Sequence, residues 1–151
     1  MSHQEKNISA SLVSFSLILV YYLIRMLGML PIAELESSKL FRLWGIVILL
    51  GIVGTIIASI FTHIIAAIVH AIQTGEEDPK IDDTEDERDK LIDLRGTRVT
   101  YIVSSLGVAL SMLAFVLGQP ALVMFSLLIF FGLIAQVIGD ISRLVLYRRG
   151  F

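Results

Sequence analysis

Four long apolar runs, separated by short or strongly charged segments, constrain this chain more than any other feature. They extend over about residues 8–30, 43–72, 99–117 and 121–146. A helix of about 20 apolar residues crosses the roughly 30 Å hydrocarbon core of a bilayer. Lipid cannot satisfy the backbone of an open strand edge, so each run is predicted to be a transmembrane helix. The sequence therefore predicts an all-α, polytopic membrane protein, with its four transmembrane helices bundled into one domain.

The composition agrees with this prediction. The chain of 151 residues is 56% hydrophobic, with a mean hydropathy of +0.83 and 17% charged residues, whereas a soluble domain carries about 25% charged residues. The first run is expected to be a retained span, because only Lys6 flanks it and its apolar stretch is too long for a signal peptide. From Phe41 to Gln73 a helix would measure about 50 Å, so the second helix is predicted to project from the membrane.

The distribution of basic residues predicts the orientation. With four spans, the N-terminus, the segment 73–98 and the C-terminus lie on one side of the membrane. Eight of the twelve Lys and Arg residues are in these three segments, whereas the opposite connection holds only Lys39 and Arg42, with Arg25 nearby. Positive residues concentrate on the cytoplasmic face. We therefore expect both termini and the charged segment to be cytoplasmic.

The segment 73–98 is unusually charged, with eleven charged residues in positions 82–98. Thr84 and Glu87 have the spacing of a capping box, which predicts a helix that starts in water near Thr84 and continues through the membrane to about Leu117. The preferred hypothesis is that this cytoplasmic extension of the third helix docks a partner protein or a second copy. The predicted docking surface consists of Glu85, Asp86, Arg88, Asp89, Lys90 and Asp93, with Leu91, Ile92 and Leu94 facing another helix. A solvated extension without a partner is the alternative.

Ionisable residues inside the fourth run suggest a second hypothesis. A charged residue within a span is a functional-site candidate, and by depth Asp140 and Arg143 should lie near the inner interface. A small transporter or channel could use them as an inner polar gate, composed of His63, Arg98, Gln136, Asp140 and Arg143. A purely structural ion pair is the alternative, and the central thirds of the spans offer only hydroxyl groups to a solute.

The histidines suggest a third hypothesis, the binding of haem or quinone. His63 and His70 are seven residues apart and share a helix face, but His3 is the only other histidine. No cysteine or carboxylate completes a tetrahedral metal set at a recognised spacing. We therefore expect no metal and no cofactor.

Motifs of familiar enzymes are missing from the sequence. It has no cysteine, no phosphate-binding glycine loop and no G-x-S-x-G, and the acidic segment does not fit a calcium-binding EF-hand loop. We expect no enzyme and no direct binding of nucleic acid. Tyr147, Arg148 and Arg149 are predicted to anchor the C-terminus to the lipid bilayer. Small residues at four-residue spacing, such as Gly54 and Ala58, allow close helix packing, and a homo-oligomer, with a dimer favoured, is expected.

Two stretches carry a resemblance to a known family. The sequence DERDKLIDLRGTRVTYIV (residues 86–103) and the ending LVLYRRGF (residues 144–151) resemble a family of small prokaryotic four-span membrane proteins of unknown function. The resemblance implies a multi-pass protein of the prokaryotic inner membrane. Members of that family often lie beside helix-turn-helix regulators, which implies a regulatory partner in the cytoplasm.

Overall fold

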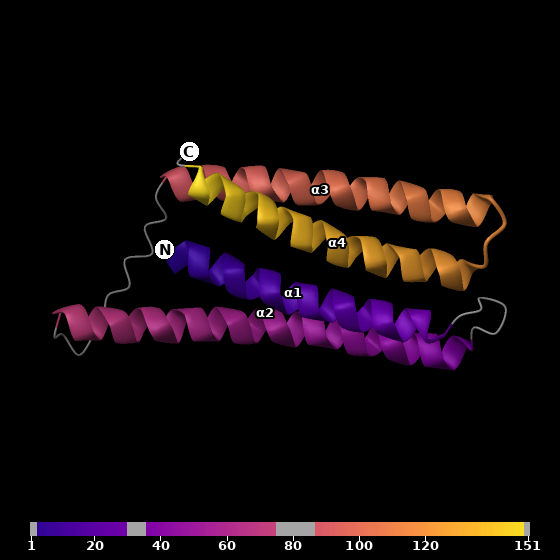
Figure 1. The fold of residues 1–151 in the computed structure, drawn as a ribbon, viewed down its shortest axis with the longest axis horizontal. Helices are drawn as coiled ribbons and strands as arrows, with labels where there is room; N and C mark the ends of the chain where they lie inside the picture. Colours follow the sequence, from indigo (N-terminus) through magenta and orange to yellow (C-terminus); the bar gives the residue numbers. More distant parts are fainter. Residues whose placement is uncertain (1–2, 30–35, 75–86, 150–151) are drawn as a thin grey trace.

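The computed structural model describes residues 3–29, 36–74 and 87–149, with the side chains of the second helix described in full as far as residue 57 and in part beyond it. Four helices make up this part of the chain (Figure 1): α1 His3–Leu27, α2 Ser37–Thr74, α3 Glu87–Val116 and α4 Ala121–Arg148. The described residues contain no strand. The prediction of an all-α four-helix bundle is confirmed.

All four helices are long and apolar enough to cross a membrane. The qualifying segments are Gln4–Leu27, Ser37–Ile57, Glu87–Val116 and Ala121–Arg148. Large apolar side chains lie on their outer surfaces: Leu17, Leu106 and Val116, for example, are 66%, 61% and 78% exposed. A bundle in water would bury such side chains, because burying apolar area is what stabilises it. The architecture is that of a multi-pass membrane protein.

The second helix is longer than one span requires, as the sequence predicts. Its 38 residues correspond to about 57 Å at 1.5 Å per residue, and Figure 1 shows it projecting beyond the other three helices. α1 begins, α2 ends, α3 begins and α4 ends on this side, which we call the charged end. The predicted helix start at Thr84 lies outside the described residues.

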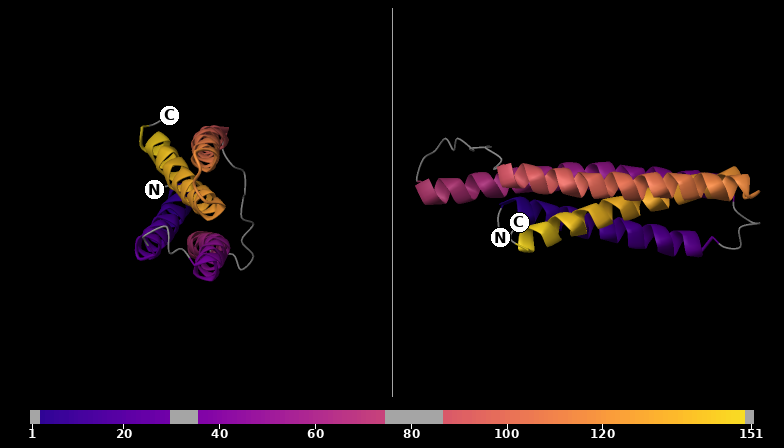
Figure 2. Two further views of the ribbon diagram at one scale, coloured as in Figure 1. Left: turned by 90° about the vertical axis from the view of Figure 1, so that its right-hand side faces the viewer. Right: turned by 90° about the horizontal axis from the view of Figure 1, so that it is seen from above.

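The helices form two antiparallel hairpins that meet along α1 and α4. α3 packs along α4, and α1 packs against both α2 and α4, whereas α2 touches α4 only slightly. The end-on view in Figure 2 shows the resulting four-cornered arrangement. The contact between the two hairpins is therefore made by α1 and α4. Within the second hairpin, the turn between α3 and α4 contains Gly118, whose φ of +91° is a conformation that favours glycine.

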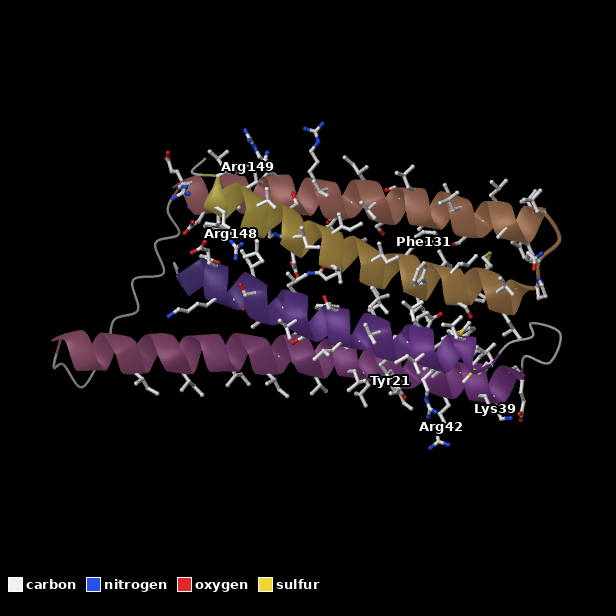
Figure 3. The ribbon with its side chains drawn as sticks, in the orientation of Figure 1. Tyr21, Lys39, Arg42, Phe131, Arg148 and Arg149 are labelled. Carbon is white, nitrogen blue, oxygen red and sulfur yellow. The ribbon has the colours of Figure 1, made fainter. Side chains whose placement is uncertain are left out.

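Glycines let α3 and α4 approach closely. The Cα of Gly107 lies against the Phe131 side chain, which points from α4 toward α3 (Figure 3), and Gly139 of α4 lies against Thr100. A Cβ at either glycine would overlap these neighbours. Gly107 and Gly139 thus serve the packing of the α3–α4 hairpin itself.

An apolar cluster closes the end opposite the charged end. Tyr22, Leu40, Trp44 and Leu133 are buried there between α1, α2 and α4. The Tyr22 hydroxyl donates a 2.7 Å hydrogen bond to the backbone carbonyl of Ser126, so the polar atom of this residue is satisfied within the apolar surroundings. α1, α2 and α4 are thereby held together at this end.

Replacing Gly107 by Ala should weaken the α3–α4 hairpin. The new methyl group would overlap Phe131 near its backbone, where the side chain cannot move aside, and overpacking of this kind costs about 1–3 kcal/mol. The free energy of unfolding in mixed micelles measures the effect. Gly132→Ala is the matched control, because a Cβ there meets nothing within 4 Å. Equal stability of the two variants would contradict the close approach.

Candidate functional site

A polar cavity lies between the helices at the charged end. Its volume is about 420 Å³, and all four helices contribute to its wall. It follows α1 from Gln4 to Phe15, eleven steps along the helix or about 16 Å. The polar side chains that line it are Gln4, Asn7, Ser11, Ser14, Thr55, Asp89, Asp93, Gln136, Asp140, Arg143 and Tyr147. In a bundle that exposes many large apolar side chains, these polar groups are turned toward the interior.

Asp140 is the most deeply buried charged residue of the cavity, with only 2% of its surface exposed. Its Oδ2 accepts a 2.7 Å hydrogen bond from the Ser11 hydroxyl of α1. Its Oδ1 accepts hydrogen bonds from Gln136 Nε2 at 3.2 Å and from Arg143 Nη1 at 3.1 Å. A buried carboxylate is tolerated only when donors and an opposite charge replace water. Asp140 therefore joins α1 to α4 at the inner part of the cavity.

Arg143 connects α4 to α3. Besides Asp140, its guanidinium contacts Asp93 Oδ1 through Nε at 2.9 Å and Thr97 Oγ1 through Nη2 at 2.8 Å. The side chain crosses directly over Gly96, where a Cβ would collide with it. Because Gly96 has no side chain, the long arginine can lie flat between the two helices. One guanidinium is thus shared by two carboxylates on different helices.

Residues from both stretches that carry the family resemblance meet at the charged end, where Asp89 and Tyr147 line the cavity. The Tyr147 hydroxyl of α4 donates a 2.8 Å hydrogen bond to Asp89 Oδ1 of α3. Arg88 lies with its guanidinium 6.0 Å from the centroid of the Tyr147 ring, at the outer limit of a cation–π contact, and Nη2 donates to the Tyr147 carbonyl at 3.4 Å. The acidic start of α3 and the aromatic end of α4 therefore hold each other.

Only part of the predicted polar gate is brought together. Gln136, Asp140 and Arg143 form one hydrogen-bonded group. Arg98 is exposed on the outside of α3 and does not line the cavity. His63 lies within α2, but its side chain, like that of His70, lies outside the described residues.

The predicted docking surface is divided between two sides of α3. Arg88 and Lys90 are exposed, whereas Asp89 and Asp93 bond to side chains of α4. Glu85 and Asp86 lie outside the described residues. Of the three apolar residues expected to face another helix, Ile92 is buried, whereas Leu91 and Leu94 are 50% and 67% exposed.

The predicted lipid anchor is divided in the same way. Arg148 and Arg149 are exposed at the charged end, where Figure 3 labels them. Tyr147 instead turns toward α3 and lines the cavity.

Sequence reasoning missed the contribution of α1. Ser11 is 129 positions from its partner Asp140, so no local pattern connects the two. A signal was present, however: Gln4, Asn7, Ser11 and Ser14 follow one another at intervals of three and four residues, the spacing of a single helix face. Thr97, which accepts from Arg143, has no comparable signature.

The cavity wall carries more negative than positive charge. Three carboxylates, of Asp89, Asp93 and Asp140, face one guanidinium, of Arg143, which gives a formal charge of −2 when all four are ionised. Among the residues that the structure describes, no three of His, Cys, Asp or Glu are grouped so that they could hold a metal ion. The excess of negative charge and the hydroxyl and amide oxygens of the wall can attract a hydrogen-bonding cation.

Comparisons with known proteins add no identity to this geometry. No family model, no curated protein and no solved structure matches the chain. The family resemblance of the two charged stretches therefore stays a prediction.

Removing the positive charge of Arg143 should destabilise the bundle strongly. Arg143→Met leaves the buried carboxylate of Asp140 without a cation, at a cost of about 3–5 kcal/mol in unfolding free energy. Asp93→Asn is the control, because its carboxylate is 70% exposed and such a pair contributes at most about 1 kcal/mol. The double variant Arg143→Met/Asp140→Leu should be more stable than Arg143→Met alone. Equal losses for Arg143→Met and Asp93→Asn in mixed micelles would contradict this account.

Proposed function

We propose that this chain is a small multi-pass transport protein whose solute site is the polar cavity around Asp140. The observation that supports the proposal is the cavity itself. An ionisable residue within a membrane helix costs free energy. Such residues face the bundle interior or a water-filled cavity, and they often mark the path of a transported ion or solute. By the distribution of basic residues, the charged end with both termini is cytoplasmic, so the solute would enter the cavity from the cytoplasm.

The two ends of the bundle differ in the way that alternating access requires. Transport by alternating access needs a solute site that is open to one side while the other side is closed. Polar side chains line the cavity toward the charged end, whereas Tyr22, Trp44 and Leu133 pack as an apolar cluster toward the opposite end. This arrangement supports an inward-open state, in which α1 and α4 make the contact between the two hairpins.

The solute that fits this cavity best is a small organic ammonium ion. The excess of carboxylates favours a cation, and the hydroxyl and amide oxygens accept hydrogen bonds from N–H groups. A volume of about 420 Å³ far exceeds the roughly 30 Å³ that one water occupies in the liquid. A bare alkali ion would leave most of this space unfilled, whereas an organic cation would occupy it.

Arg143 is the proposed gate. The Asp93 carboxylate that Arg143 contacts is largely exposed, whereas the Asp140 carboxylate that it contacts is buried. Exposed ion pairs contribute little, so an arriving ammonium could replace the guanidinium at Asp93 first. The cation would then share the buried carboxylate of Asp140 with Arg143, which would weaken the link between α3 and α4.

The test is uptake of radiolabelled methylammonium into proteoliposomes. Asp140→Asn should reduce uptake to the level of protein-free liposomes, because the variant loses the buried negative charge of the site. Glu87→Gln is the matched control, since it neutralises an exposed acid of α3 that does not line the cavity. Wild-type uptake no faster than that of empty liposomes, or full uptake in Asp140→Asn, would refute the proposal.

A docking role remains the second candidate, on the strength of one observation. Lys90 is exposed beside the apolar Leu91 and Leu94 on the outer side of α3, and the exposed Arg88 lies at the edge of this surface, where it contacts Tyr147. Together they would offer a basic and apolar surface to a cytoplasmic partner. Chemical cross-linking in native membranes tests it: a partner should be lost in Arg88→Glu/Lys90→Glu and kept in Lys39→Glu/Arg42→Glu at the opposite end. Loss in both variants, or in neither, would count against docking at this surface.

A further inference from the structure

We infer that the cavity selects primary ammonium ions over quaternary ones, and that the hydroxyl groups of its wall make this selection. The inference rests on the proposed function, because it concerns the same cavity, and it narrows the class of solute. A primary ammonium ion carries three N–H donors, whereas a quaternary one carries none. The two classes of cation therefore differ in whether hydrogen-bond acceptors of the wall can hold them.

Every hydroxyl group on the described wall of the cavity donates its hydrogen to another group of the protein. The four residues concerned are Ser11, Ser14, Thr55 and Tyr147. The first and the last donate to carboxylates, as described above. Ser14 Oγ donates to the carbonyl of Ala10 at 2.9 Å, and Thr55 Oγ1 donates to the carbonyl of Gly51 at 2.8 Å. A hydroxyl has one hydrogen and two acceptor lone pairs, so in this arrangement each oxygen can only accept from a solute.

The nitrogen donors around the buried carboxylate are used in the same way. Arg143 donates through each of its three nitrogens, to the side chains of Asp93, Asp140 and Thr97. Gln136 Nε2 lies 3.2 Å and 3.4 Å from the two oxygens of Asp140. These bonds direct the donors toward the protein's own oxygens. The polar groups around Asp140 thus offer a solute oxygens rather than hydrogens, which suits a cation rich in N–H groups.

Acceptor oxygens lie next to the buried carboxylate. Ser11 touches Asp140 directly. Ser14 follows Ser11 by three positions on α1, which makes the two residues neighbours on the helix surface, with their Cβ atoms about 5–6 Å apart. Thr55 adds an acceptor from α2 on the wall of the same cavity. An ammonium ion bound at Asp140 would therefore meet hydroxyl oxygens on the helices that do not carry the carboxylate.

The aromatic residues of the wall do not provide the kind of site that a quaternary ammonium ion prefers. Such ions are bound by cages of aromatic rings through cation–π contacts. The described wall has two aromatic residues, Phe15 and Tyr147, and the Arg88 guanidinium already lies 6.0 Å from the centroid of the Tyr147 ring. Two rings, one of them beside a guanidinium, do not enclose a methylated nitrogen. The wall therefore favours the primary ion.

Equilibrium binding of radiolabelled methylammonium to the purified protein in micelles tests the inference, with unlabelled tetramethylammonium as the competitor. The wild type should bind methylammonium at least about tenfold more tightly, since one hydrogen bond from a charged donor accounts for a ratio of this size. Ser14→Ala should weaken the binding of methylammonium about tenfold and leave that of tetramethylammonium unchanged. Thr55→Val, which replaces the hydroxyl with a methyl group, should have the same effect from α2.

Ser9→Ala is the matched control. Ser9 also lies on α1, and its hydroxyl donates to the carbonyl of Glu5, four residues earlier, at 2.7 Å. Ser14 makes the same kind of bond to Ala10, but Ser9 does not line the cavity. Both alanine variants lose one such helix contact, so their unfolding free energies should be equal. Only Ser14→Ala should change the binding of methylammonium.

Half-displacement of methylammonium by tetramethylammonium at equal concentration would overturn the inference, and so would a loss of binding in Ser9→Ala as large as that in Ser14→Ala. Unchanged binding in both Ser14→Ala and Thr55→Val would also overturn it. The proposed transport is judged separately, by uptake. Selective binding without uptake would refute transport alone, whereas uptake with no preference between the two cations would refute the inference alone. A wild type that binds no methylammonium would refute both.

Discussion

Neither hydrocarbon nor packed protein can solvate an unpaired charge, and the rest of the bundle depends on how this constraint is met at Asp140. Ser11 supplies a donor from α1, and Gln136 and Arg143 supply donors from α4. Arg143 then reaches Asp93 on α3. The need to neutralise one buried carboxylate thereby links three helices at the charged end, while apolar packing joins α1, α2 and α4 at the other.

The charged residues of α3 do not all face the same environment. Asp89 and Asp93 face α4 and the cavity, while Arg95 and Arg98 are exposed outside. A helix turns by 100° per residue, so charges that are close in the sequence point in different directions, and Glu87 lies on the outer side as well. The carboxylates that face α4 belong to the proposed cation site, whereas the outer charges do not line the cavity. A dense run of charges can thus serve two different environments.

Much of the architecture could be predicted from the sequence, but the composition of the site could not. The polar trio on α4 has a local signal, because its members are three or four residues apart on one helix. No local pattern links Ser11 or Thr97 to its partner, since both partners are far away in the chain; the polar face of α1 marks Ser11 but not the residue that it contacts. The prediction that Arg98 belongs to the gate depends only on its depth in the membrane. Depth places a residue along the membrane normal and says nothing about the side of the helix on which it lies.

The sequence by itself determined that the chain is helical, that it has four segments able to span a membrane, and that its charges gather at one end. Each of these follows from local composition, because a backbone in lipid must form its hydrogen bonds within its own helix. Only the tertiary structure decided that the acidic start of α3 holds the end of α4, as Asp89 does with Tyr147, and that a polar stripe on α1 completes a cavity. Those choices depend on how each helix is rotated against its neighbours, and rotation is set by side-chain contacts between segments far apart in the chain.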